Sequence, residues 1–227
     1  MLGEAAIAMW WDMATAWREE FEDWHTHEHF AERLAIPGFL RGSRWASADG
    51  GEGFFVMYEL DGYETLTSPA YLARLNQPTP WSARLMPHHR HMVRSQCRVL
   101  DATGSGLSRH ALTLRLSPEP GRDTELREFL RQISGRFAAG RGGTAAHLLR
   151  TETPTIAVTT EQNIRGGRDA AADWIVIAIG YDDRAMRALR QGDLSDDVLV
   201  AHGARPEVRD GLYVISCAVT PADFGRS

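Results

Sequence analysis

The sequence has few cysteines and no excess of basic residues. Its two cysteines, Cys97 and Cys217, lie far apart and follow no metal-ligand spacing, so both are expected to be reduced core residues. That usage is typical of a cytoplasmic protein. Lysine and arginine number 25 against 30 aspartates and glutamates, which gives a net charge of −5. Because phosphate binding needs a basic face, nucleic acid is not an expected partner.

Long apolar runs and a basic leader are also missing. No uninterrupted apolar stretch approaches the ~18 residues of a membrane helix, so we expect no membrane partner. The opening residues do not follow the pattern of a secretory signal, which again favours the cytoplasm. The motifs of a nucleophile elbow, a phosphate loop and a dinucleotide site are absent. A chain of 227 residues is nevertheless long enough to build a large apolar core.

The first 101 residues follow the element order of a ferredoxin-like unit. A nearly continuous apolar run at 5–13 predicts a buried strand, and apolar residues spaced by three and four predict an amphipathic helix at 17–35. Pro37 and Gly38 should end that helix. The expected elements of this half are strands at 5–13, 39–45, 54–60 and 88–100, and helices at 17–35 and 61–75.

Residues 107–227 repeat this pattern at low identity, with Leu126 in the place of Phe21. A stretch at about 153–170 has no counterpart and should form an inserted loop. We therefore predict an α+β fold of tandem ferredoxin-like βαββαβ repeats, with units at 1–101 and 107–227. The bare faces of the two sheets should pack together as an intramolecular, pseudo-dimeric α+β barrel. The chain would then be a monomer or a homodimer of such barrels, with a ligand cavity between the sheets.

Several short motifs of the first half resemble the dimeric α+β barrel superfamily, and in particular its EthD-like branch. They are Glu28-His29-x-x-Glu32-Arg33-Leu34-Ala35-Ile36-Pro37-Gly38-Phe39, Tyr58-Glu59-Leu60, Leu66-x-Ser68-Pro69-x-Tyr71 and Pro80-Trp81. The resemblance implies a ferredoxin-like barrel. It also implies a place among cofactor-free monooxygenases, polyketide cyclases, lactone isomerases and haem enzymes. His29 and Arg33 match the histidine and arginine of the family's helix-end motif.

Histidines and acids gather on the 17–35 helix. His25 and His29 lie four residues apart on one side, and a helical wheel puts Glu28 close to the centre of the apolar stripe. The second half has no such cluster, which suggests that the first half supplies the chemistry and the second half the shape. The predicted catalytic residues are His29, Glu28, His25 and Arg33.

Each of the central residues has an alternative interpretation. A carboxylate in an apolar face needs a partner or a raised pKa, so Glu28 is either a tuned acid or base, or is simply neutralised by an arginine or histidine. His29 is either a general base or hydrogen-bond donor to substrate, or a helix-terminal histidine that bonds the last carbonyls. A metal site could use His25 and His29, but no pattern such as His-Glu-x-x-His is present. We expect neither a metal nor a cofactor.

Aromatic residues and further histidines of the first half could line the cavity. His89 and His91 should share one face of the 88–100 strand, and Arg44 could hold an anionic oxygen. The predicted substrate-binding residues are Trp11, Arg44, Trp45, Tyr58, His89 and His91. The sequence thus favours a cofactor-independent enzyme of the cyclase, isomerase, lyase or oxygenase type that acts on a small hydrophobic or aromatic molecule. The alternative is a non-catalytic barrel for ligand binding or assembly.

Overall fold

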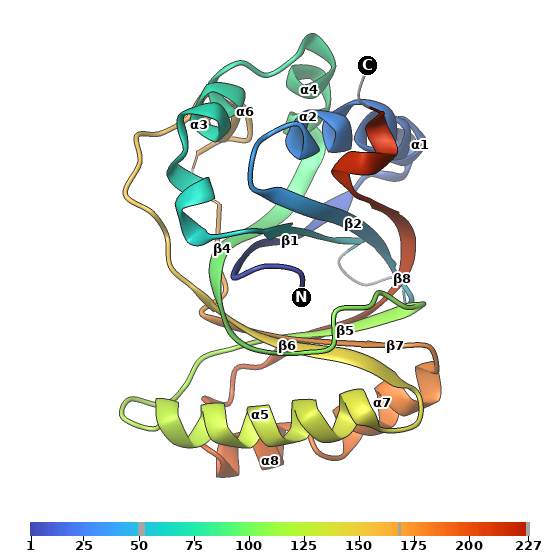
Figure 1. Ribbon diagram of the computed structural model, residues 1–227, viewed down its shortest axis with the longest axis vertical. Helices are drawn as coiled ribbons and strands as arrows, with labels where there is room; N and C mark the ends of the chain where they lie inside the picture. Colours follow the sequence, from blue (N-terminus) through green and yellow to red (C-terminus); the bar gives the residue numbers. More distant parts are fainter. Residues whose placement is uncertain (50–52, 168, 226–227) are drawn as a thin grey trace.

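Eight antiparallel strands close into one barrel (Figure 1). The computed structural model describes residues 1–49, 53–167 and 169–225. Around the barrel the strands follow the order β1-β3-β2-β8-β5-β7-β6-β4. The strands are β1 (Ala5–Met13), β2 (Phe39–Ser47), β3 (Phe54–Leu60), β4 (His89–Thr103), β5 (His110–Leu116), β6 (Gly143–Thr151), β7 (Trp174–Gly180) and β8 (Arg209–Val219).

The barrel consists of two four-stranded sheets with the same internal order. Strands β4-β1-β3-β2 make the first sheet, and the corresponding strands β8-β5-β7-β6 make the second. The β2–β8 and β4–β6 pairings join the two sheets. Because both joints lie within one chain, the predicted intramolecular α+β barrel is confirmed. The division into units at 1–101 and 107–227 stays a prediction.

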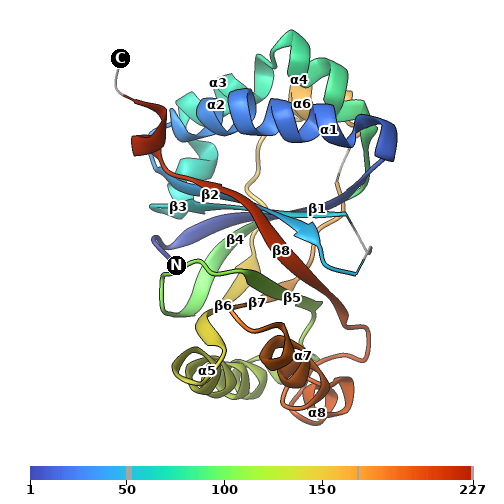
Figure 2. The same cartoon turned by 90° about the vertical axis from the view of Figure 1, so that its right-hand side faces the viewer.

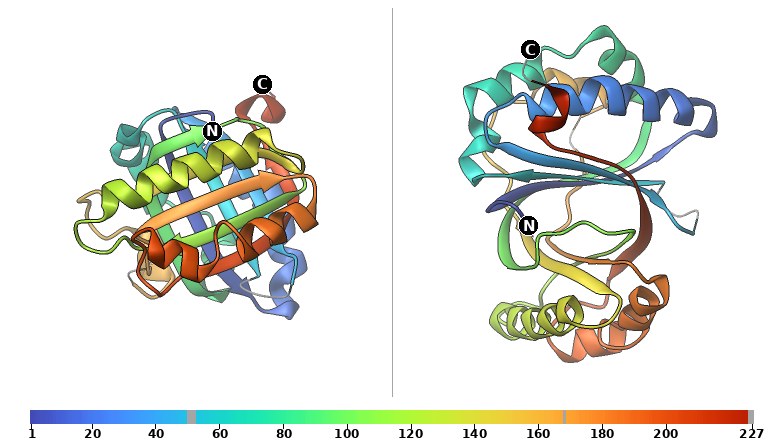
Figure 3. Two further views of the ribbon diagram at one scale, coloured as in Figure 1. Left: turned by 90° about the horizontal axis from the view of Figure 1, so that it is seen from below. Right: turned by 45° about the vertical axis from the view of Figure 1, so that its right-hand side comes forward.

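Helices cover the outer faces of the two sheets in separate layers (Figures 1 and 2). In the view from below, α5, α7 and α8 lie across the second sheet (Figure 3). Between residues 1 and 225, apart from the undescribed positions, no helix is both long and apolar enough to cross a membrane. The helices are α1 (Thr15–Trp24), α2 (Phe30–Leu34), α3 (Pro69–Asn76), α4 (Pro80–Leu85), α5 (Asp123–Ala139), α6 (Thr160–Ile164), α7 (Asp183–Gln191) and α8 (Asp196–Ala201), with a π-helical turn η1 (His25–His29) and 3-10 turns η2 (Tyr63–Thr67), η3 (Met86–His88) and η4 (Pro221–Phe224).

Strand β1 is apolar on both faces because both faces are buried. Ala6, Ala8 and Trp10 turn into the barrel, whereas Ile7 and Trp11 belong to the core under the helices. A strand covered on both sides carries a continuous apolar run rather than an alternating one. This double burial accounts for the unbroken pattern at 5–13.

Side chains fill the interior of the barrel. Trp10 stacks on Phe55 with ring centroids 5.1 Å apart, and Trp45 and Tyr213 are fully buried in the same cluster. Small barrels are commonly filled in this way, because eight strands leave an interior just wide enough for side chains. The expectation of a ligand cavity between the two sheets is therefore corrected. Trp45 is a barrel-core residue rather than part of a ligand pocket.

The connection between β6 and β7 crosses from the second half onto the helix layer of the first (Figure 1). It contains α6, which begins with a capping box formed by Thr159 and Gln162. The backbone N–H of Thr160 donates to Asn76 Oδ1 on α3 at 3.1 Å, and the N–H of Arg94 on β4 donates to the carbonyl of Ala170 at 2.8 Å. The predicted inserted loop, whose Arg168 lies outside the described residues, thus reaches the other half.

Candidate functional site

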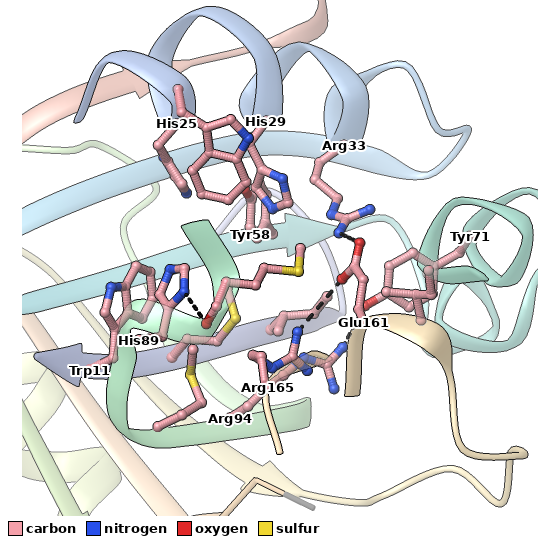
Figure 4. Close-up of a pocket in the computed structure, with 16 residues that line it drawn as sticks. Trp11, His25, His29, Arg33, Tyr58, Tyr71, His89, Arg94, Glu161 and Arg165 are labelled. Carbon is pink, nitrogen blue, oxygen red and sulfur yellow. Dashed lines mark hydrogen bonds and ion pairs between the residues drawn. The ribbon is translucent and has the colours of Figure 1, made fainter. Parts of the chain in front are cut away.

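A cavity of about 50 Å³ lies between the first sheet and the helices that cover it. One wall is the α1–η1–α2 helix and the other is the outer face of β1, β3 and β4 (Figure 4). This volume exceeds the ~10–15 Å³ that a cavity needs to hold a water molecule. The lining residues are Ile7, Met9, Trp11, Trp24, His25, His29, Arg33, Tyr58, Tyr71, Leu75, Met86, His89, Met92, Arg94, Glu161 and Arg165.

A π-turn decides which side of the helix faces the cavity. The N–H of Phe30 bonds the carbonyl of His25, five residues back, instead of the usual four. Side chains take up carbonyls of the preceding turn: Thr26 Oγ1 donates to the Glu22 carbonyl at 2.6 Å. Such competition from a hydroxyl disturbs the regular helical ladder. The extra residue rotates the following turn, so that His25 and His29 are buried and Glu28 is only partly buried.

His25 and His29 are neutral in this setting. Burial lowers the pKa of both rings well below the ordinary value of 6.5, and neighbouring arginines add to the effect, Arg44 at His25 and Arg33 at His29. The two ring centroids lie 5.4 Å apart. The Nδ1 atom of His29 lies 3.9 Å from Glu32 Oε2. An imidazolium formed at His29 would therefore have a carboxylate close by.

Arg33 reaches the cavity from α2 and is held by the inserted loop. Its Nη2 donates to Glu161 Oε1 at 2.5 Å, and both side chains are only 5% exposed. Arg165 lies 3.7 Å from Glu161 Oε2 and 2.8 Å from Asp169 Oδ2. The four groups alternate in sign along a buried chain, so their charges balance. The second half therefore contributes charged groups to the site, and the expectation that it supplies shape alone is corrected.

Several polar atoms around the cavity have no hydrogen-bond partner. Among the described residues they include Nδ1 of His25 and of His29, Nη1 of Arg33, the hydroxyl of Tyr58 and Nε1 of Trp11. Burial raises the pKa of the Tyr58 hydroxyl, so it keeps its proton and acts as a donor. Buried polar groups are almost always paired, and an unpaired one costs about 1–3 kcal/mol. A group of them at one cavity indicates a place for a polar ligand atom.

The strand wall and the adjacent turn η3 contribute His89, three methionines and Arg94. His89 Nδ1 donates to the Met86 carbonyl at 3.0 Å, which leaves Nε2 as an acceptor. Burial lowers the pKa of His89 to about 4. The methionines are Met9, Met86 and Met92. Their flexible side chains let a pocket adapt to a ligand larger than its resting volume.

Six of the ten predicted site residues meet at this cavity. They are His29, His25, Arg33, Trp11, Tyr58 and His89. Their roles remain predictions, but their convergence is a property of the fold.

The other four predicted residues lie elsewhere for identifiable reasons. Glu28 accepts from Trp24 Nε1 at 3.0 Å and from Thr79 Oγ1 at 2.5 Å, which fixes the helix to α4. Arg44 donates to the Glu22 carbonyl and to Ser216 Oγ. Trp45 belongs to the barrel interior.

His91 is the last of the four. It has a left-handed backbone with φ of 55°, is exposed and bonds Asp12. That conformation breaks the alternation of β4, so His89 and His91 do not share a face as predicted.

The sequence interpretation missed Glu161, Arg165, Tyr71 and Arg94 as cavity residues. For the inserted loop a signal was present, because Thr159-x-x-Gln162 is the pattern of a capping box and indicates a helix start. For Arg94 the sequence holds no such signal. The left-handed backbone of His91 changes which face of β4 the following side chains point to, and a strictly alternating pattern does not reveal that change.

The fold is that of the dimeric α+β barrel proteins, built here within one chain. Solved structures similar to it include an anthrone oxidase-like protein, at 10% identity over 97% of this chain and 94% of that chain with a TM-score of 0.66. A candidate monooxygenase of Fusobacterium nucleatum is 10% identical over 97% of this chain and 96% of that chain, with a TM-score of 0.63. A haem-binding protein of Thermus thermophilus is 12% identical over 96% of this chain and 92% of that chain, with a TM-score of 0.55. No family model and no curated protein matches the sequence.

A haem does not fit the cavity as it stands. Sites for ligands of drug size measure ~300–1,000 Å³, several times the volume found here, so movement of the flexible methionines makes room for a small ligand but not for a haem. The His25 ring is also packed edge-on against Phe30, with ring centroids 4.2 Å apart, and the His29 ring packs at a tilt against Trp24, with centroids 4.4 Å apart. In the described part of the chain, no three histidine, cysteine or acidic side chains are placed to hold one metal ion.

Proposed function

We propose that this chain is an enzyme that moves a proton on a small hydrophobic, aromatic molecule bound in the cavity of the first half, without a cofactor. Cyclases, isomerases, lyases and cofactor-free oxygenases share such a step. The observation that carries the proposal is the presence of buried, neutral and unpartnered imidazoles beside a buried guanidinium with an unused N–H. Perturbed titratable groups of this kind cluster at functional sites.

His29 is the proposed general base. A buried imidazole of lowered pKa is unprotonated at neutral pH and has a lone pair available. After it takes a proton from a carbon next to a carbonyl, the positive charge lies 3.9 Å from Glu32. Glu32 is thus the proposed partner that orients and stabilises the protonated ring. His25, with its ring centroid 5.4 Å away, completes the polar wall.

Arg33 and Tyr58 are the proposed donors to the substrate oxygen. When the C–H bond breaks, its electron pair moves into the enolate and the charge develops on the carbonyl oxygen. The unpartnered Nη1 of Arg33 and hydroxyl of Tyr58 are fixed before the reaction and need no reorganisation. Glu161 holds the other nitrogen of Arg33 and so keeps the guanidinium in place.

The lining supports a flat, apolar substrate. Trp11 and Trp24 provide aromatic faces, and the methionines can move to enlarge the space. The likeness of the fold to an anthrone oxidase-like protein and a candidate monooxygenase supports an enzyme of this kind but is limited to the fold. The alternative is a barrel that binds such molecules without converting them.

Deuterium exchange separates the two functions. The probe is 2-indanone, a flat bicyclic ketone with acidic C–H groups, incubated anaerobically in D2O and followed by proton NMR. We expect the protein to accelerate loss of the C–H signals, and His29→Gln to remove that acceleration. His27→Gln is the matched control, because His27 lies on the same helix with a side chain 71% exposed.

The result has three outcomes. Acceleration that depends on His29 but not on His27 supports the enzyme. Binding of 2-indanone, seen by calorimetry, without any acceleration supports the binding-only barrel. Acceleration that His29→Gln leaves intact contradicts the role of His29 as the base.

A further inference from the structure

Arg94 differs from the other charged residues that line the cavity, because each of those has an oppositely charged partner. Arg33, Glu161, Arg165 and Asp169 form an alternating chain of two positive and two negative groups. Arg94 is the remaining cation of the lining. Among the described residues, no carboxylate lies within 4.0 Å of its guanidinium, and its side-chain hydrogen bond goes to the neutral hydroxyl of Tyr71 at 2.5 Å.

Other acids near the cavity do not offset Arg94. Glu32 is engaged by Arg74 at 2.9 Å and faces His29 at 3.9 Å. The histidines of the lining are neutral because burial lowers their pKa values. Among the described residues that line the cavity, Arg94 is therefore the charged side chain without a counter-ion, and it is half-buried, where water screens its charge only in part.

Arg94 and Tyr71 together present donors to one side of the cavity. The Tyr71 hydroxyl accepts from Arg94 Nη2, so its own hydrogen is left for another acceptor. A guanidinium is a planar fork of donors that matches the two oxygens of a carboxylate. In Figure 4, Arg94 lies on the strand side, across from His25 and His29 on the helix.

We infer that the ligand of this cavity is the anion of a hydrophobic carboxylic acid, whose carboxylate binds Arg94 and Tyr71. The apolar part then extends along the methionines toward His29. This inference rests on the proposed ligand cavity and adds the charge of the substrate. Charge-assisted hydrogen bonds are the strong ones in a partly buried site, so the charge should decide the affinity.

The test compares two probes with the same bicyclic skeleton, indane-2-carboxylate and 2-indanone, by isothermal titration calorimetry at pH 7.5. We expect the carboxylate to bind at least about tenfold more tightly, in line with a charge-assisted hydrogen bond. Arg94→Gln should abolish that preference and change the affinity for the ketone by less than about twofold. Arg94→Lys should keep part of the preference, because it keeps the charge without the planar fork.

Arg98→Gln is the matched control. Arg98 lies on the same strand, is exposed, does not line the cavity and pairs with Glu152. Its replacement should leave both affinities unchanged. Thermal unfolding of each variant shows whether the fold is kept.

Three results would overturn the inference in distinguishable ways. If the ketone binds but the carboxylate binds no more tightly, the anionic substrate is wrong. If Arg94→Gln leaves the preference intact, Arg94 does not hold the carboxylate. Either result overturns the inference while the proposed function stands. If neither probe binds and exchange of the ketone is not accelerated, the proposed function falls together with this inference.

Discussion

Glu161→Gln should destabilise the whole protein, although the residue lies in an inserted loop. The substitution keeps the size of the side chain and removes its charge, which leaves the Arg33 guanidinium, 5% exposed, without a counter-ion. Breaking a buried pair in this way costs ~3–5 kcal/mol. Arg165 keeps Asp169 at 2.8 Å, so the lower end, about 3 kcal/mol, is expected.

Urea unfolding followed by tryptophan fluorescence measures this change. With a slope of ~2–3 kcal/mol per molar urea, the midpoint should fall by roughly 1 M. Glu128→Gln is the matched control: that carboxylate also pairs with an arginine, but on the exposed face of α5, and its loss should leave the midpoint unchanged.

A double variant sharpens the test. Arg33→Met with Glu161→Leu removes both charges and fills the space with apolar groups, so it should be more stable than Glu161→Gln alone. The coupling energy of the pair should be about 2–3 kcal/mol. Two results would refute the claim that the buried pair ties the loop to the site. One is a urea midpoint for Glu161→Gln equal to that of the unaltered protein. The other is a loss of stability in the double variant as large as the sum of the losses in Arg33→Met and Glu161→Leu alone.

Two further predictions concern pH and the barrel interior. The free energy of unfolding should decrease as the pH falls from 6.5 toward 4, because the unfolded chain binds protons on histidines that the folded protein keeps neutral. His89 accounts for roughly 3 kcal/mol of this decrease. His89→Asn should therefore make the free energy of unfolding, measured with urea, depend less steeply on pH. An unchanged dependence on pH would contradict the burial of His89. Trp45→Ala should cost about 3–5 kcal/mol of stability yet leave 2-indanone affinity unchanged in calorimetry, because Trp45 fills the barrel interior; weakened binding would place the ligand there instead.

The sequence predicted the barrel well because its signals are local. The apolar run of β1, the Pro37-Gly38 stop and the aromatic strand β3 each specify an element over a few residues. The resemblance of several short motifs to the dimeric α+β barrel superfamily led to the same prediction. The filled interior was not predicted, because alternation says which residues face inward but not how much space they leave.

The site was predicted in part, and the misses have specific causes. A helical wheel that assumes the same rotation at every residue places Glu28 at the centre of the buried face. The π-turn changes that rotation, and in the structure His25 and His29 are the buried residues instead. The left-handed His91 likewise breaks the strand pattern. Glu161 comes from a loop with no counterpart in the first half, so neither the repeat nor the resemblance could place it.

The central claim is that His29 is a neutral ring at a ligand cavity. The most direct test is NMR of protein with nitrogen-15 in its histidine rings, recorded at pH 6 with and without indane-2-carboxylate. We expect both nitrogens of His29 to give the signals of a neutral imidazole. These signals should shift when the ligand is added, while those of exposed His27 should not. Signals of a protonated His29 that are unaffected by the ligand would contradict it.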